Sequence, residues 1–209
     1  TRRELARPAR MRPVTRLLHL VASDQRRGAE TFGVELGDHL AADGHEVRVM
    51  AVTASHSGEV LPVELAGQGS APRAVVDLVR AVRWAELVVA FGSITLDVAA
   101  ALGTLLGRPF IYRIIGDPSV WARTPARSLR VRTSIRRAAR VVALYPNAAT
   151  ELSERYGLLR ANMRVIPRGV PDGAFLPASA DRRRAAREEL GLSPDRRWLL
   201  YLGALSPEK

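Results

Sequence analysis

Residues 87–115 read LVVAFGSITLDVAAALGTLLGRPFIYRII and contain two short apolar runs joined by a helical segment. Leu87–Phe91 and Phe110–Ile115 have the length of strands, and Ile94–Leu106 has the length of a helix that stops at Gly107. A strand that is apolar on both faces needs neighbours in a parallel sheet. This stretch therefore predicts a strand–helix–strand unit inside such a sheet.

The same alternation continues on both sides of this unit. We predict further helices at residues 29–42, 74–84, 126–139, 147–156 and 182–190, and further strands at 16–22, 46–52, 141–144 and 163–166, with a weaker strand at 61–63. Strands that alternate with helices of about 10–15 residues indicate an α/β fold with a doubly wound parallel sheet. The predicted fold class is Rossmann-like, with helices on both faces of the sheet.

The chain is predicted to divide into four parts. Residues 1–13 form a disordered basic arm, 14–170 a Rossmann-like domain, 171–196 a linker with a helix, and 197–209 the start of a second domain. The last part begins with an apolar run at Trp198, followed by a turn at Gly203. Because such a strand needs parallel partners, we expect the second domain to be truncated.

Composition limits the class of protein. The chain has no cysteine, no apolar run of about 18 residues and no signal-peptide core near its start, so we expect a cytoplasmic location. The net charge is +11, and only Lys209 among the 32 Lys and Arg residues is a lysine. This charge favours anionic partners.

Three loops after predicted strands could carry chemistry, because ligands of such sheets lie at the carboxyl ends of the strands. Gly28 begins a helix, where backbone N–H groups favour an anion, or it serves only to turn the chain. Asp117, after Gly116, either accepts hydrogen bonds from a hydroxylated ligand or caps the next element. Arg168 either binds a phosphate or is simply solvated. Patterns for nicotinamide binding, a P-loop or zinc ligands are absent from the sequence.

Several segments, taken in order, resemble the retaining glycosyltransferases of family four, which have a GT-B fold. The residues concerned are Gly28-Ala29-Glu30, Gly44-His45-Glu46-Val47, Val141–Leu144, Val165–Val170, Arg187–Leu192 and Leu202–Lys209. The resemblance covers residues 14–209. It implies a two-domain enzyme whose amino-terminal domain holds the acceptor and whose carboxy-terminal domain holds a nucleotide-diphosphate sugar. Such an enzyme transfers a hexosyl unit to a hydroxyl of a lipid, a polysaccharide or a small glycoside.

The resemblance also assigns site residues, without a metal or a cofactor. Gly28, Ala29, Glu30 and Gly116 would bind the acceptor, Asp117 would be catalytic, and Lys209 with Arg168 would bind the donor diphosphate. As the bond to the diphosphate breaks, negative charge develops that fixed cations stabilise. A fragment of this length is expected to be inactive by itself, because most donor contacts would lie beyond Lys209.

Two positions depart from the family pattern. Ile115 stands where the family has a histidine that contacts the donor sugar, and Ala204 stands where it has an arginine. His19 and His45 are predicted to be structural, so neither replaces the missing histidine. These departures favour an alternative function, a non-catalytic carbohydrate- or lipid-binding module of the same fold.

The predicted helix at 126–139 is unusually basic. The arginines of this stretch are Arg123, Arg127, Arg130, Arg132, Arg136, Arg137 and Arg140. Such a helix suits peripheral contact with an anionic membrane, or it packs on the core with a solvated outer face. Nucleic-acid binding is not expected, because aromatic residues make up only 5% of the chain and no recognised motif is present.

Overall fold

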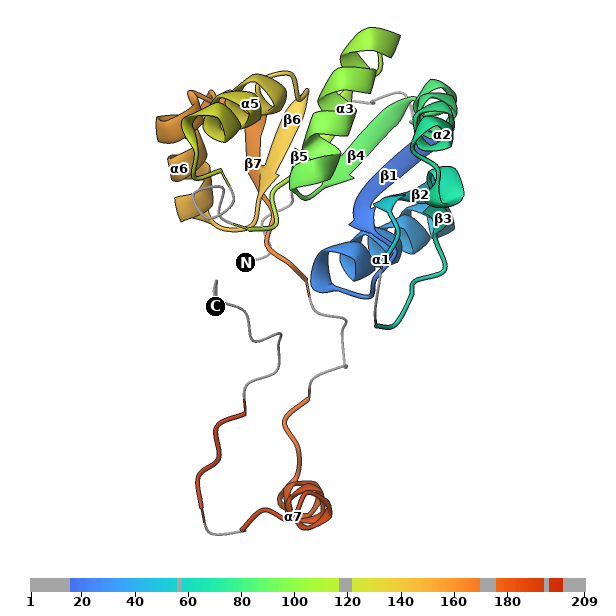
Figure 1. Ribbon diagram of the computed structural model, residues 1–209. Coiled ribbons are helices and arrows are strands. Elements are labelled where there is room, and N and C mark those ends of the chain that lie inside the picture. The colour runs from blue at the N-terminus through green and yellow to red at the C-terminus, as the bar shows by residue number, and fades with distance from the viewer. Residues whose placement is uncertain (1–15, 56–57, 117–121, 170–175, 194–195, 201–209) are drawn as a thin grey trace. The chain divides into compact units, whose positions relative to one another are not determined.

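The computed structural model describes residues 16–55, 58–116, 122–169, 176–193 and 196–200. Two units are distinguished along the chain, Thr1–Pro167 and Arg168–Lys209. The first unit contains a seven-stranded sheet in which every pair of neighbouring strands is parallel (Figure 1). The predicted fold class is therefore confirmed.

The strand order is β3-β2-β1-β4-β5-β6-β7, so the chain first builds the sheet in one direction from β1 and then in the other. In this order β1 pairs with both β2 and β4. The bounds of the strands are β1 Arg16–Ser23, β2 Glu46–Thr53, β3 Glu64–Leu65, β4 Leu87–Phe91, β5 Phe110–Arg113, β6 Arg140–Ala143 and β7 Met163–Val165. The reversal beside β1 is the topological switch point at which doubly wound sheets open a crevice for ligands.

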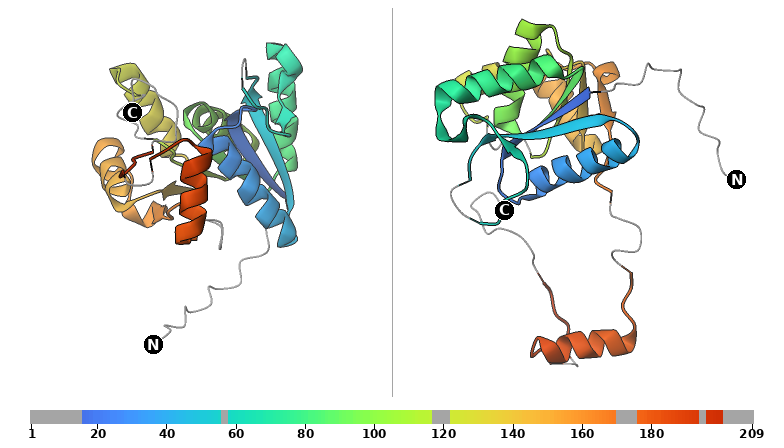
Figure 2. Two further views of the ribbon diagram at one scale, coloured as in Figure 1. Left: turned by 90° about the horizontal axis from the view of Figure 1, so that it is seen from below. Right: turned by 90° about the vertical axis from the view of Figure 1, so that its right-hand side faces the viewer.

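Helices cover both faces of the sheet (Figures 1 and 2). The helix α1 lies on one face, whereas α2, α3, α5 and α6 lie on the other. Their bounds are α1 Gly28–Ala42, α2 Ala71–Trp84, α3 Ser93–Leu106, α5 Pro125–Ile135 and α6 Pro146–Tyr156, with short 3₁₀ turns η1 Gly67–Gly69 and η2 Arg160–Asn162. The two sides follow from right-handed crossovers, because the chain moves in opposite directions before and after the switch point.

Two apolar clusters fill the layers. The larger one joins the sheet to α2, α3, α5 and α6 and includes Leu18, Leu20, Tyr112 and Leu152. The smaller one, which contains Val21 and Phe91, packs against Phe32 and Leu36 of α1. The alternation of side chains along β1 explains this division, since successive residues point to opposite faces.

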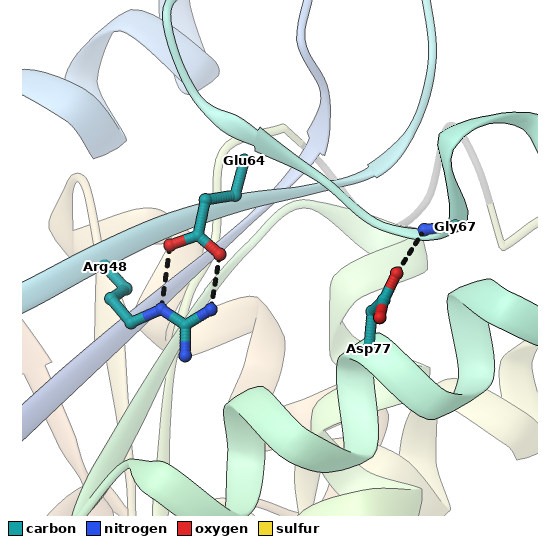
Figure 3. Close-up of polar contacts among 4 residues, drawn as sticks. All are labelled: Arg48, Glu64, Gly67 and Asp77. Carbon is teal, nitrogen blue, oxygen red and sulfur yellow. Dashed lines mark hydrogen bonds and ion pairs between the residues drawn. The ribbon is translucent and has the colours of Figure 1, made fainter.

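The short edge strand β3 is held in place by polar contacts (Figure 3). Arg48 of β2 forms a two-pronged ion pair with Glu64 of β3, with 2.7 Å from Arg48 Nε to Glu64 Oε1. The Arg48 guanidinium also lies 5.1 Å from the centre of the Trp84 ring. Nearby, the backbone N–H of Gly67 donates to Asp77 of α2 over 3.0 Å. A strand of two residues has few ladder hydrogen bonds, so these contacts secure its connection to α2.

Several predicted bounds need correction. The weak strand expected at 61–63 lies at Glu64–Leu65, and the basic helix expected at 126–139 ends at Ile135. The strand expected over Phe110–Ile115 ends at Arg113. The helix expected at 147–156 begins one residue earlier, because Pro146 is the first helical residue of α6 and Tyr145 is its N-cap.

The second unit contains α7, Ala180–Glu189, whose N-cap Ser179 accepts a hydrogen bond from the backbone N–H of Arg182. Gly191 follows with a φ of 64°, a conformation that favours glycine after a helix. The predicted final strand begins at Trp198, but residues 198–200 have no strand conformation and residues 201–209 lie outside the described part. The predicted start of a second domain at residue 197 therefore stays a prediction.

Candidate functional site

The carboxyl edge of the sheet collects the loops that join strands to helices. Here β1 leads into α1, β4 into α3 through Gly92, and β6 into α6. Because α1 and α3 lie on opposite faces, their amino termini flank the edge at the switch point (Figure 1). This edge is the candidate site.

The first group of sequence-predicted residues, Gly28, Ala29 and Glu30, forms the first turn of α1. The N-cap residue Arg27 has extended backbone, and its side chain makes no capping hydrogen bond. A helix amino terminus presents backbone N–H groups and the positive end of the helix dipole. The first turn of α1 can therefore donate hydrogen bonds to an oxygen-rich ligand.

Glu30 is the buried carboxylate of this edge, with only 6% of its surface exposed. Burial raises the pKa of the Glu30 carboxyl above its ordinary value. Its own backbone N–H, the charge of Arg27 and the backbone N–H of Ser23 all act to lower this pKa, but burial outweighs them. Glu30 thus stands as a desolvated acidic group beside backbone donors.

The loop before α1 is fixed by the segment that follows β2. The backbone N–H of Leu61 donates to the Asp24 carbonyl over 2.7 Å, and that of Arg26 donates to the Glu59 carbonyl over 2.8 Å. The Asp24 carboxylate accepts from the backbone N–H of Ser55. These hydrogen bonds fix the loop that leads into α1, and thereby fix the position of Glu30 in the first turn of the helix.

Aromatic rings and one guanidinium pack between α1 and the sheet. The sequence analysis did not predict this arrangement. Arg113, at the carboxyl end of β5, is buried and lies 4.0 Å from the centre of the Phe32 ring. Phe32 packs edge-on to Phe91, whose ring centre is 5.3 Å from that of His19. His19 Nδ1 donates to the Gly33 carbonyl over 2.8 Å. The prediction that His19 is structural fits this position, because its pKa is lowered by burial.

The sequence did contain a signal for Arg113. It is the one charged residue in the otherwise apolar run Phe110–Ile115, and an arginine is seldom buried unless its charge is compensated. The register places it opposite Phe91 of β4 and Val142 of β6. A buried guanidinium two strands from β1 adds positive charge to the edge that α1 borders.

Gly116 follows β5 and borders a small pocket. The pocket is lined by Ile114, Ile115, Gly116, Leu144, Tyr145, Ala148 and Glu151. Tyr145 is 49% exposed, and Glu151 lies in the second turn of α6. These two polar side chains were not predicted as site residues, since no motif marks them. The structure brings Gly116 and the first turn of α1 to the same edge, with β4 between their strands.

Three further residues were predicted for the site, namely Asp117, Arg168 and Lys209. Asp117 and Lys209 lie outside the described residues. Arg168 is exposed and is the first residue of the second unit. Ile115, at the position of the family histidine, is partly buried against the apolar cluster of Val21 and Phe91.

Neither a metal cluster nor a membrane span is present in the described part of the chain. Within it, no group of three or more His, Asp or Glu side chains is arranged to hold a metal ion. No helix in these ranges is both long and apolar enough to cross a bilayer.

A parallel, doubly wound sheet with helices on both faces defines a Rossmann-like domain. A family model described as Glycosyltransferase Family 4 matches residues 26–173. The chain belongs to this family. A comparison with curated protein sequences finds no match.

Solved structures of similar fold come from several bacteria. Anabaena Alr3699/HepE in complex with UDP and glucose has a TM-score of 0.69 at 17% identity, covering 85% of this chain and 50% of that chain. Sucrose-phosphate synthase from Thermosynechococcus elongatus has a TM-score of 0.59 at 14% identity, and the match covers 87% of this chain and 53% of the synthase. A glycosyltransferase from Rickettsia africae ESF-5 has a TM-score of 0.57 at 13% identity, and the match covers 86% of this chain and 50% of that glycosyltransferase.

These likenesses confirm the fold. The chain spans about half the length of the solved structures that it matches, and it has the Rossmann-like architecture of one half of a GT-B enzyme. The predicted resemblance to family-four glycosyltransferases is confirmed by the family match.

Proposed function

We propose that this chain is the acceptor-side domain of a retaining glycosyltransferase that works in the cytoplasm. The whole enzyme would transfer a hexosyl unit from a nucleotide-diphosphate sugar to a hydroxyl acceptor. The family match supports the reaction class. Alr3699/HepE, a protein of similar fold, was solved with UDP and glucose and with UDP-glucose, which supports a nucleotide sugar as donor.

The observation that carries the acceptor role is the buried Glu30 in the first turn of α1. A sugar hydroxyl both donates and accepts hydrogen bonds. The Glu30 carboxylate can accept from such a hydroxyl, while the N–H groups of Gly28 and Ala29 can donate to a neighbouring oxygen. Gly116 borders the same edge without a side chain, which leaves room for a sugar ring.

The donor contacts are proposed from the resemblance alone. Lys209 and Arg168 would stabilise the negative charge that develops on the diphosphate as its bond to the sugar breaks. Asp117 would contact the reacting groups beside Gly116. No metal is required in this scheme, because cationic side chains supply the positive charge.

One observation favours a second candidate, a non-catalytic carbohydrate- or lipid-binding module. Ile115 replaces the family histidine and contributes to the apolar cluster rather than offering a polar group. Such a module would bind a sugar or lipid through the same edge without releasing a nucleotide.

The test is a turnover screen with the protein expressed from its complete reading frame. UDP- and GDP-sugars are combined with glycoside and lipid acceptors, and the released nucleoside diphosphate and the anomeric configuration of the product are measured. We expect turnover with retention of configuration. We expect Glu30→Gln to lower kcat/KM by about 10- to 100-fold, because a hydrogen bond to a charged group contributes about 1.5–3 kcal/mol.

The matched control is Glu35→Gln, an exposed position one turn further along α1, which should leave kcat/KM within about twofold. Inversion of configuration would contradict the proposed mechanism. Acceptor binding without any released nucleotide would favour the non-catalytic module.

A further inference from the structure

The outer face of three neighbouring helices exposes apolar side chains to solvent. α2, α3 and α5 lie side by side over one face of the sheet, with α3 in the middle (Figure 1). Leu105 of α3 is 76% exposed and Leu129 of α5 is 62% exposed. The other large exposed apolar residues of these helices are Val75, Val76 and Ile94. Helical spacing puts Ile94, Ala101 and Leu105 on one outward stripe, so the centre of this face is aliphatic.

The same three helices and the turn after α5 expose many arginines, of which Arg73 and Arg80 line a pocket beside β3. The exposed arginines of the three helices and of the turn after α5 are Arg73, Arg80, Arg83, Arg127, Arg130, Arg132, Arg136 and Arg137. The only acidic residues in α2, α3 and α5 are Asp77 and Asp97, and each is paired with an arginine. The face, defined here as the α2–α3–α5 face, therefore carries a large net positive charge.

The helix on the opposite face of the sheet, α1, is acidic. Residues 28–47, which include α1, contain five acidic residues and neither lysine nor arginine. These are Glu30, Glu35, Asp38, Asp43 and Glu46. Figure 2 shows α1 on the side of the sheet away from α2 and α3. Because positive charge gathers on one face and negative charge on α1, a negatively charged surface would orient the protein with its α2–α3–α5 face toward that surface.

We infer that the α2–α3–α5 face binds the surface of an anionic lipid bilayer. The aliphatic side chains would enter the region between headgroups and acyl chains, and the arginines would contact lipid phosphates. Nucleic acid also carries phosphates, but single strands are bound by stacking on aromatic rings, whereas the exposed side chains at the centre of this face are aliphatic. Contact with DNA would leave these five side chains without an apolar partner.

The face adjoins the candidate site. α3 begins at Ser93, directly after β4 and Gly92, so Ile94 lies in the first turn at the carboxyl edge. α1 begins at the same edge of the sheet. This step rests on the proposed glycosyltransferase function. Docking of the α2–α3–α5 face would bring the acceptor site next to the lipid surface. It therefore favours a hydroxyl on a lipid headgroup as the acceptor.

The experiment measures co-sedimentation of the purified 209-residue chain with phosphatidylcholine vesicles that contain or lack phosphatidylglycerol. We expect binding only to the vesicles with phosphatidylglycerol. The double variant Arg132→Gln/Arg136→Gln should weaken binding by about 25-fold, since each arginine near an anionic surface contributes about fivefold. The double variant Leu105→Ser/Leu129→Ser should weaken it at least about tenfold, because both leucines would leave the interface.

Matched controls lie on the second unit. Arg182→Gln/Arg183→Gln removes the same charge from α7, and Leu176→Ser/Leu190→Ser removes the same apolar groups at exposed positions. Both should bind within about twofold of the unchanged chain. Circular dichroism of each variant checks that the fold is retained.

Four results would overturn the inference: absence of binding to anionic vesicles, equal losses in the controls, no loss for the leucine variant, or displacement by duplex DNA at equal phosphate concentration. The assay needs no turnover. If vesicle binding fails, the proposed transfer reaction is not affected. If the turnover screen fails, the proposed membrane-binding face is not affected.

Discussion

At the scale of single residues, Glu30 combines a cost in stability with the proposed role in acceptor binding. The folded protein raises the pKa of Glu30, so it binds a proton more tightly than the unfolded chain does. Stability from this group is therefore greatest at low pH and falls as the pH rises from about 4.5 through the folded pKa. We predict that Glu30→Gln raises the free energy of unfolding at pH 7.5 by on the order of 1 kcal/mol.

This prediction is measured by urea unfolding at several pH values. The gain from Glu30→Gln should shrink as the pH is lowered toward about 4.5, because Glu30 of the unchanged protein becomes increasingly protonated below its raised pKa. Glu35→Gln, at an exposed position, should show no comparable dependence. A gain that stays constant over this range would mean that ionisation of Glu30 is not its source.

The candidate site was predictable where a residue type signals its own role. Gly28 was noted because it begins a helix directly after a predicted strand, whereas Ala29 and Glu30 were assigned by the family resemblance. The three residues form the first turn of α1. Arg113 was missed although it is the one charged residue of an apolar run, because the strand register that places it opposite Phe91 is not visible in the sequence. Tyr145 and Glu151 come near Gly116 through the pairing of β5 with β6, which is a contact distant in sequence.

At the scale of elements, the sequence predicted the order of strands and helices better than their ends. Short, fully apolar runs such as Leu87–Phe91 were placed correctly because burial on both faces leaves little choice. The helix expected to end at Ala139 stops at Ile135, because the chain must turn to place Arg140 in β6. The strand near residue 61 was misplaced, since only two residues of that segment pair with β2.

The close approach of α1 to β1 depends on a glycine. A Cβ built at Gly33 would lie 2.8 Å from Val21 Cγ1, and one at Gly37 would lie 3.2 Å from Val49 Cγ2. We predict that Gly33→Ala lowers the free energy of unfolding by about 1 kcal/mol, because overpacking costs about 1–3 kcal/mol and better helix propensity returns about 1 kcal/mol. Gly37→Ala should have a smaller effect or none.

Both variants are compared by urea unfolding followed by circular dichroism. The Gly33 carbonyl accepts the hydrogen bond from His19, so a shift of α1 also disturbs a buried histidine. If Gly33→Ala proved as stable as the unchanged chain, α1 would have to move away from β1 without cost. The packing that places Glu30 would then be less strict than the contact distance indicates.

At the scale of the whole molecule, the buried apolar side chains that the structure describes all belong to the first unit. The buried apolar residues run from Leu17 to Met163, and β7 is the last strand of the sheet. We predict that a chain ending after Pro167 unfolds cooperatively, with a Tm within about 2 °C of the full chain, since about 1 kcal/mol corresponds to a shift of about 2–4 °C at this size. Calorimetry measures both chains.

A chain ending after Tyr156 is the control: it loses β7 together with the buried Leu158 and Met163, so it should lack a cooperative transition. A Tm lowered by more than about 5 °C on removal of residues 168–209 would show that the second unit contributes to the stability of the first, and the predicted domain boundary at residue 170 would then be wrong.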